Sequence, residues 1–253
     1  MIRTFTLLFS LAIGLFTPFS PAFSAIRVGT VAFDPPYVIS SSQGFEMDLI
    51  HLLCQRMNQT CNLIVMDYYQ LFTALKEGRI DVALDGIDFY VPPNPLNEGY
   101  IFSYPYLLSE GQFLVTKQSG IKTLSDLPKG TVVGLLQERE IVDAGIYYSY
   151  FTKHYGDRFK IAMYRTPTTL ISALHDGIIK AAFLDNNEAG YWMLNGGGAF
   201  FALDKPMKVG DGIGIMALPN NAALIQAFDV QLKTIENSKA YLNLYNTYMG
   251  MGE

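Results

Sequence analysis

The chain has 253 residues, half of them hydrophobic, which is enough for one or two globular cores and argues against disorder. Its net charge is −5, and its lysines and arginines form no cluster. This acidic balance argues against binding to nucleic acid or to anionic membranes.

Residues 1–24 differ in composition from the rest of the chain. Arg3 is their one charged residue, Phe5 to Phe16 is an apolar run, and Ala22 and Ser24 are small residues at the positions that a signal peptidase reads. The run is shorter than the roughly 20 residues of a membrane-spanning helix. We therefore expect a cleavable signal peptide at 1–24, export without a lipid anchor, and no membrane insertion.

An amphipathic helix is predicted within "GFEMDLIHLLCQRM", because its apolar residues recur at helical spacing. Cys54 lies near its end, and Cys61 begins the next predicted strand, "CNLIVM". In an exported chain such a pair is most simply a disulfide, and two buried free thiols are the alternative. A metal site is disfavoured, because two thiols without a nearby histidine cannot supply four ligands.

Two segments of the chain repeat one pattern. "LFTALKEGRIDVALDG" (71–86) and "LISALHDGIIKAAFLDN" (170–186) each combine helical leucines, a glycine and a short apolar strand that ends in an aspartate. An apolar segment with Val-Gly precedes each copy, at 26–33 and 131–137. The alternation of strand and helix predicts an α/β fold with two similar lobes, each a mostly parallel sheet flanked by helices.

Acidic residues follow the predicted strands in both halves. Asp34 follows the first strand, Asp85 and Asp88 follow the strand of the first repeat, and Asp185 follows that of the second. Ligands of parallel sheets bind at the carboxyl ends of the strands. If the two lobes face each other, these four carboxylates lie at the cleft between them, although each could also be a solvated loop residue or a helix N-cap.

The order and spacing of several motifs resemble the periplasmic amino-acid-binding proteins of ABC importers (family 3 solute-binding proteins), above all those that bind basic amino acids. The resemblance covers nearly the whole chain after residue 24 and rests on "GFEMDLIHLLCQRM", "ALKEGRIDVALDG", "FSYPY", "LSDLPKGTVVGLLQ" and "GDGIGIMALPNN". It implies two lobes joined by two crossing strands, near 112–117 and 212–218, which close around one ligand. The implied lobes are 25–112 with 214–253, and 113–213. The protein would be a periplasmic monomer that needs no cofactor or metal and serves an importer permease.

The resemblance also implies which residues contact the ligand. Asp185 matches the acid that meets an α-amino group, and aromatic residues from Phe33–Tyr37 and at Tyr68 would enclose the ligand side chain. The full set of expected ligand-binding residues is Phe33, Asp34, Tyr37, Tyr68, Asp85, Gly86, Asp88, Arg139 and Asp185.

The chain departs from the family at the residues expected to bind an α-carboxylate. Asp88 stands where the family has Ser or Thr, "VPPNPLNEG" lacks the arginine that follows, and "ERE" (138–140) replaces a Gly-Ser/Thr turn. Two interpretations stay open. Arg139 replaces the missing arginine, or the ligand is a cation without an α-carboxylate.

The leading hypothesis is a binding protein for a small cationic amino acid or amine, with no catalytic residues. One alternative is an enzyme on the same scaffold, similar to a cyclohexadienyl dehydratase, with Glu138 or Glu140 as the acid. The other is a signalling module that has lost the amino-acid clamp. The three histidines are scattered, and no nucleophile and base occur at catalytic spacing.

Overall fold

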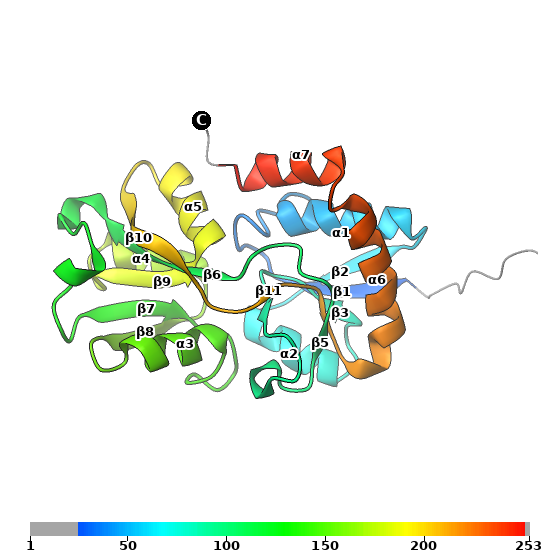
Figure 1. Ribbon diagram of the computed structural model, residues 1–253, viewed down its shortest axis with the longest axis horizontal. Coiled ribbons are helices and arrows are strands. Elements are labelled where there is room, and N and C mark those ends of the chain that lie inside the picture. Colours follow the sequence, from blue (N-terminus) through cyan, green and yellow to red (C-terminus); the bar gives the residue numbers. More distant parts are fainter. Residues whose placement is uncertain (1–24, 251–253) are drawn as a thin grey trace, which may run out of the picture.

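The computed structural model describes residues 25–250, so the predicted signal peptide lies outside the described residues. Figure 1 shows two lobes side by side, each built on a sheet with helices around it, and two chain segments that run between them. The predicted two-lobed α/β fold is confirmed. None of the helices within residues 25–250 is long and apolar enough to cross a membrane.

The first sheet has the strand order β2-β1-β3-β12-β5. Strand β1 is parallel to β2 and β3, whereas β12 is antiparallel to both of its neighbours. Helices α1, α2, α6 and α7 complete the core of this lobe. The bounds are β1 Ile26–Thr30, α1 Phe45–Arg56, β2 Cys61–Val65, α2 Tyr68–Lys76, β3 Val82–Ala83, β5 Ile101–Phe102, β12 Met216–Ala217, α6 Ala222–Ile235 and α7 Lys239–Tyr248.

The second sheet has the order β10-β6-β9-β7-β8. Alternate residues of β6 enter different cores: Phe113 and Val115 belong to one cluster and Leu114 to another, as expected for a sheet covered on both faces. The bounds are β6 Glu110–Thr116, β7 Val132–Leu136, α3 Ile146–Tyr155, β8 Lys160–Tyr164, α4 Pro167–His175, β9 Ala181–Asp185, α5 Asn186–Asn195 and β10 Phe200–Lys208. Short 3-10 helices occupy Pro95–Asn97, Lys117–Ser119, Leu124–Asp126 and Pro219–Asn221.

The chain passes between the lobes twice, from β5 to β6 and from β10 to β12. Between the two five-stranded sheets, β4 (Asp88–Phe89) pairs with β11 (Gly212–Ile213). The first passage lies earlier than the expected 112–117, because this segment is part of β6, which pairs with β9 and β10. Its apolar side chains are buried on both faces, a pattern that a sequence does not distinguish from that of a crossing strand.

The internal repeat corresponds to one structural unit present in both lobes. The unit is β1-α1-β2-α2-β3 in the first lobe and β7-α3-β8-α4-β9 in the second. Equivalent residues even have equivalent partners, because Gly29 pairs with Ala83 and Gly134 pairs with Ala182. The repeat therefore places Asp85 and Asp185 at the same end of the two sheets.

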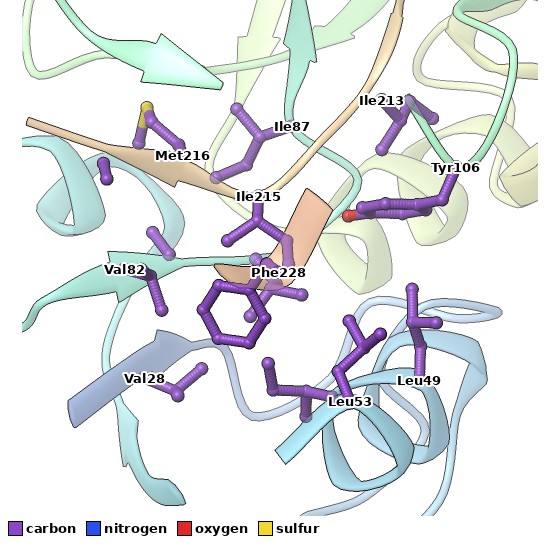
Figure 2. Packing of buried hydrophobic residues seen from close by; sticks show 14 of the residues in the cluster. Val28, Leu49, Leu53, Val82, Ile87, Tyr106, Ile213, Ile215, Met216 and Phe228 are labelled. Atoms are coloured by element: carbon purple, nitrogen blue, oxygen red, sulfur yellow. The ribbon is translucent and has the colours of Figure 1, made fainter. Parts of the chain in front are cut away.

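The core of the first lobe lies between its sheet and helices α1 and α6. Figure 2 shows Val28 and Val82 on the strands close to Leu53 of α1 and Phe228 of α6, and all four side chains are fully buried. Burying each such side chain contributes about 1.5–3 kcal/mol. The predicted apolar face of α1 is confirmed, since Phe45, Leu49 and Leu53 are fully buried.

Cys54 and Cys61 form a disulfide, as predicted. The bond joins the last turn of α1 to the first residue of β2, so it fixes the end of a helix to the edge strand of the sheet. Both residues lie in or against the core of the first lobe, which makes this a structural bond.

Candidate ligand-binding site

A cavity of ≈ 410 Å³ is lined by residues from both lobes. Its lining comes mainly from the segments at the carboxyl ends of the parallel strands β1, β2 and β3 of the first lobe and β7, β8 and β9 of the second. This position is the usual place for a ligand in α/β folds, and the volume suits a molecule of amino-acid size.

Most of the sequence-predicted site residues meet at this cavity. Seven of the nine line it: Phe33, Asp34, Tyr68, Asp85, Gly86, Asp88 and Asp185. Asp34 and Asp85 follow β1 and β3 of the first sheet, and Asp185 ends β9 of the second. The fold thus gathers acids that are 151 residues apart, between Asp34 and Asp185, at one site.

Tyr37 lies behind the cavity wall and does not line the cavity. Its side chain is fully buried, and its hydroxyl donates a hydrogen bond of 2.5 Å to Asp185 Oδ1 and accepts one of 3.1 Å from Asn187 Nδ2. The Tyr37 ring also packs against Gly86, where a Cβ would lie 2.5 Å from it. Gly86 has φ +58°, so both its conformation and this close contact require glycine. Tyr37 therefore positions Asp185 from the opposite lobe.

Arg139 also lies outside the cavity, contrary to the expectation that it contacts the ligand. Its Nε donates to Glu98 Oε1 at 2.6 Å, and its guanidinium carbon lies 3.5 Å from the centre of the Phe72 ring. Its Nη1 donates to the carbonyl of Glu138. Glu98 and Phe72 belong to the first lobe and Arg139 to the second, so the arginine is engaged in a contact between lobes.

Three further carboxylates line the cavity, from Asp67, Glu138 and Glu188. Glu188 lies one helical turn after Asp185 at the start of α5, and this spacing of three residues is a signal that could have identified it from the sequence. Glu138 lies in the segment that replaces the family's Gly-Ser/Thr turn and is the acid of the enzyme alternative, but it is not in the expected ligand-binding set. Tyr147 of α3 also lines the cavity, and its hydroxyl donates to Asp185 Oδ2 at 3.3 Å.

Several of these buried carboxylate oxygens have no hydrogen-bond partner within residues 25–250. Both oxygens of Asp85 are unpartnered, as is one oxygen each of Asp34, Asp88 and Glu188. The exposed fractions of these four residues lie between 2% and 7%. A buried polar group without a partner lowers the stability of the folded protein by about 1–3 kcal/mol, and by more when the group is charged. A ligand that donates hydrogen bonds to these oxygens would remove this cost.

Burial raises the pKa of these acids well above their ordinary values, and the neighbouring acids raise it further, as Asp34 and Glu46 do for Asp85. Burial also raises the pKa of Asp185, to about 6, against the opposing effect of its hydrogen bond from Tyr37. A positive charge placed among these groups favours their ionised forms. Among the described residues no three or more His, Cys, Asp or Glu side chains are arranged to hold a metal ion.

Comparisons with known proteins agree with this architecture. Residues 26–251 match the family described as bacterial extracellular solute-binding proteins, family 3. The chain is 25% identical over 223 residues to the arginine-binding periplasmic protein of Mannheimia haemolytica, covering 85% of this chain and 87% of that protein. It is 27% identical over 232 residues to the histidine-binding periplasmic protein of Escherichia coli (strain K12), covering 84% and 86%.

A solved structure is similar across both lobes. It is the arginine third transport system periplasmic binding protein from Legionella pneumophila, with a TM-score of 0.79 and 26% sequence identity. The match covers 88% of this chain and 99% of that one.

Proposed function

Because the chain belongs to the bacterial extracellular solute-binding proteins of family 3, we propose that it binds a small cationic solute between its lobes and delivers it to an ABC importer. The names of the relatives, arginine-binding and histidine-binding periplasmic proteins, support a cationic amino acid or a related amine, a periplasmic location and a role in transport rather than catalysis. We further propose that it acts as a monomer and returns its solute chemically unchanged.

The observation that carries this proposal is the set of buried carboxylates around the cavity. Asp34, Asp85, Asp88, Asp185 and Glu188 are each at least nine-tenths buried and all line the same space. A cation in the cavity would give the unpartnered oxygens donors and offset the mutual repulsion of the acids. Phe33 and Tyr68 also line the cavity, and an aromatic face over a cation would add about 0.5–2 kcal/mol.

A thermal-shift screen with amino acids, polyamines and quaternary amines tests the proposal. A cation at 100 times its Kd should raise the free energy of unfolding by about 2.7 kcal/mol, which is a rise in Tm on the order of 5–10 °C. Stabilisation by anions or neutral sugars alone would contradict the proposal.

The variant Asp85→Asn tests whether the carboxylates bind the cation. Asp85→Asn removes a buried negative charge from the cavity, so it should weaken cation binding at least tenfold in calorimetry. Asp157→Asn makes the same chemical change on the exposed surface of the second lobe and should leave the affinity unchanged. Equal effects of the two variants would contradict binding at the cavity.

A further inference from the structure

The cavity presents hydrogen-bond acceptors in excess of donors. Seven carboxylates line it, from Asp34, Asp67, Asp85, Asp88, Glu138, Asp185 and Glu188. Arg165 is the one lysine or arginine among the residues that line it, and its side chain is exposed. A cationic ligand finds many partners here, whereas an anionic group on the ligand would need donors that are free.

The N-terminus of α3 is the place where a ligand carboxylate would find backbone donors beside the buried acids, and Glu138 already occupies it. Its Oε1 accepts from Ile146 N at 3.1 Å, and its Oε2 accepts from Tyr147 N at 2.7 Å and from Tyr148 N at 3.4 Å. The partial positive charge and free N–H groups of a helix N-terminus attract anions, so here they are satisfied by an acid of the chain itself.

The fit of Glu138 at this helix depends on Gly145. A Cβ at Gly145, which has φ +114°, would lie 2.4 Å from Glu138 Oε2, so the residue before the helix leaves room for the carboxylate. The N-termini of two neighbouring helices are also capped by side chains of the protein itself. Thr166 Oγ1 accepts from Thr169 N at the start of α4, and Asp185 Oδ1 accepts from Asn187 N at the start of α5.

Arg139, the residue after Glu138 in the sequence, already has partners outside the cavity. It pairs with Glu98 and lies over the Phe72 ring, and its exposed fraction is 8%. It therefore offers no clamp for a ligand carboxylate in this structure.

Resting on the proposed function, we infer that the solute is a cation with two or more amine or guanidine groups and no carboxylate, and that Glu138 determines this specificity. Each amine or guanidine group can donate to the unpartnered oxygens of Asp34, Asp85, Asp88 and Glu188. A ligand carboxylate would instead lie beside Glu138, Asp88 and Asp185, and like charges at close range oppose binding.

The test compares ligands that differ in the carboxylate. Calorimetry at pH 7.5 would measure agmatine against arginine, cadaverine against lysine, and putrescine against ornithine. Arginine amide is a further control, because it keeps the size and the α-amine of arginine but lacks the negative charge. We expect each amine, and arginine amide, to bind at least tenfold more tightly than its carboxylate partner.

The possible outcomes separate the two hypotheses. If an amino acid binds as tightly as its amine or more tightly, this inference is wrong, and the proposed function as a receptor for cations stands. If none of the seven compounds binds, this inference is wrong, and the thermal-shift screen with other cations separately decides whether the proposed function stands.

The variant Glu138→Ala tests the residue itself. Without the Glu138 carboxylate the N–H groups of α3 are free, so the preference for agmatine over arginine should fall at least tenfold. Glu140→Ala changes an exposed residue of the same type two positions away and should keep the preference. An unchanged preference in Glu138→Ala would refute the role of Glu138. The wild-type comparison does not depend on whether this variant folds.

Discussion

At the scale of single residues, the cavity is lined by buried carboxylates whose oxygens lack hydrogen-bond partners. Asp85 is 2% exposed and neither of its oxygens has a partner within the described chain. Such a residue destabilises the ligand-free protein, and it persists where the same group contributes to binding. The acids thus link the stability of the protein to its ligand.

The pH dependence of stability follows from the raised pKa values. The folded ligand-free protein binds protons more tightly than the unfolded chain, because burial raises the pKa of Asp185 to about 6 and that of Glu46 to about 7. Between pH 4 and 7 the free energy of unfolding therefore falls as the pH rises. For Asp185 alone the change is on the order of 2–3 kcal/mol.

We expect the ligand-free protein to have a higher Tm at pH 5.5 than at pH 7.5, as measured by calorimetry. Acids with a lowered pKa, such as Asp81 beside Arg27, change the free energy of unfolding at pH values below the range from 4 to 7. Asp85→Asn should raise the ligand-free Tm at pH 7.5 and reduce the dependence on pH. A wild-type Tm that rises steadily from pH 5.5 to 7.5 would contradict this account.

The residues that the sequence missed share a physical cause. Glu188 follows Asp185 at helical spacing and Glu138 lies in the segment that departs from the family, but their place at the cavity depends on which helix N-termini and strands the fold brings beside them. Arg139 shows the opposite case. Its position after β7 predicts a site residue, but the side chain turns towards Phe72 and Glu98, and local sequence does not determine that direction.

At the scale of elements, equivalent glycines in the two lobes leave room for the isoleucine that follows the second helix of each unit. A Cβ at Gly29 would lie 2.4 Å from Ile80 Cδ1, and a Cβ at Gly134 would lie 2.5 Å from Ile179 Cδ1. Both pairs are equivalent positions of the repeat. The sequence repeat therefore records packing as well as secondary structure.

Gly44, which precedes α1, gives a prediction at this scale. It has φ +138°, and a Cβ there would lie 2.3 Å from the Tyr37 carbonyl oxygen, a backbone atom that cannot easily move away. Gly44→Ala should reduce the free energy of unfolding by about 3 kcal/mol, the sum of backbone strain and steric overlap. Denaturant unfolding measures the loss.

The matched control is Gly120→Ala. Gly120 has φ +70°, but a Cβ there would have no atom within 4 Å. This variant should lose only about 1 kcal/mol, from backbone strain alone. Equal losses for the two glycines would show that the contact with Tyr37 has no effect.

At the scale of the whole molecule, side chains connect the lobes at several places away from the β4–β11 pair, and Arg165 over Tyr69 and Phe33 beside Trp192 are among them. Tyr37 bonds to Asp185, and Arg139 bonds to Glu98 and lies over Phe72. These contacts hold the lobes together around the cavity. We keep the lobe boundaries, 25–112 with 214–253 and 113–213, as a proposal; β6 of the second sheet begins at Glu110.

Arg139→Ala should loosen the contact between the lobes. We expect a larger radius of gyration in small-angle scattering and an affinity for the cationic solute that is roughly tenfold lower, because the contact between the lobes loses an ion pair and a cation–π contact. Arg79→Ala is the control, since Arg79 pairs with Glu77 within one lobe and both are exposed.

Variants of the partners distinguish this role from direct ligand contact. If Arg139 acts between the lobes, Glu98→Gln and Phe72→Leu should have effects in the same direction as Arg139→Ala. If only Arg139→Ala lowers the affinity and the radius of gyration is unchanged, Arg139 contacts the ligand instead.

The sequence by itself determined the alternation of strands and helices, the repeat, the Cys54–Cys61 bond and the acids at the strand ends, because these follow from periodicity and local spacing. Only the tertiary structure decided how side chains are used at the cavity. It turned Arg139 and Tyr37 away, added Glu188, and placed Glu138 on the N-terminus of α3. Those choices depend on contacts between segments far apart in the chain, which local pattern does not encode.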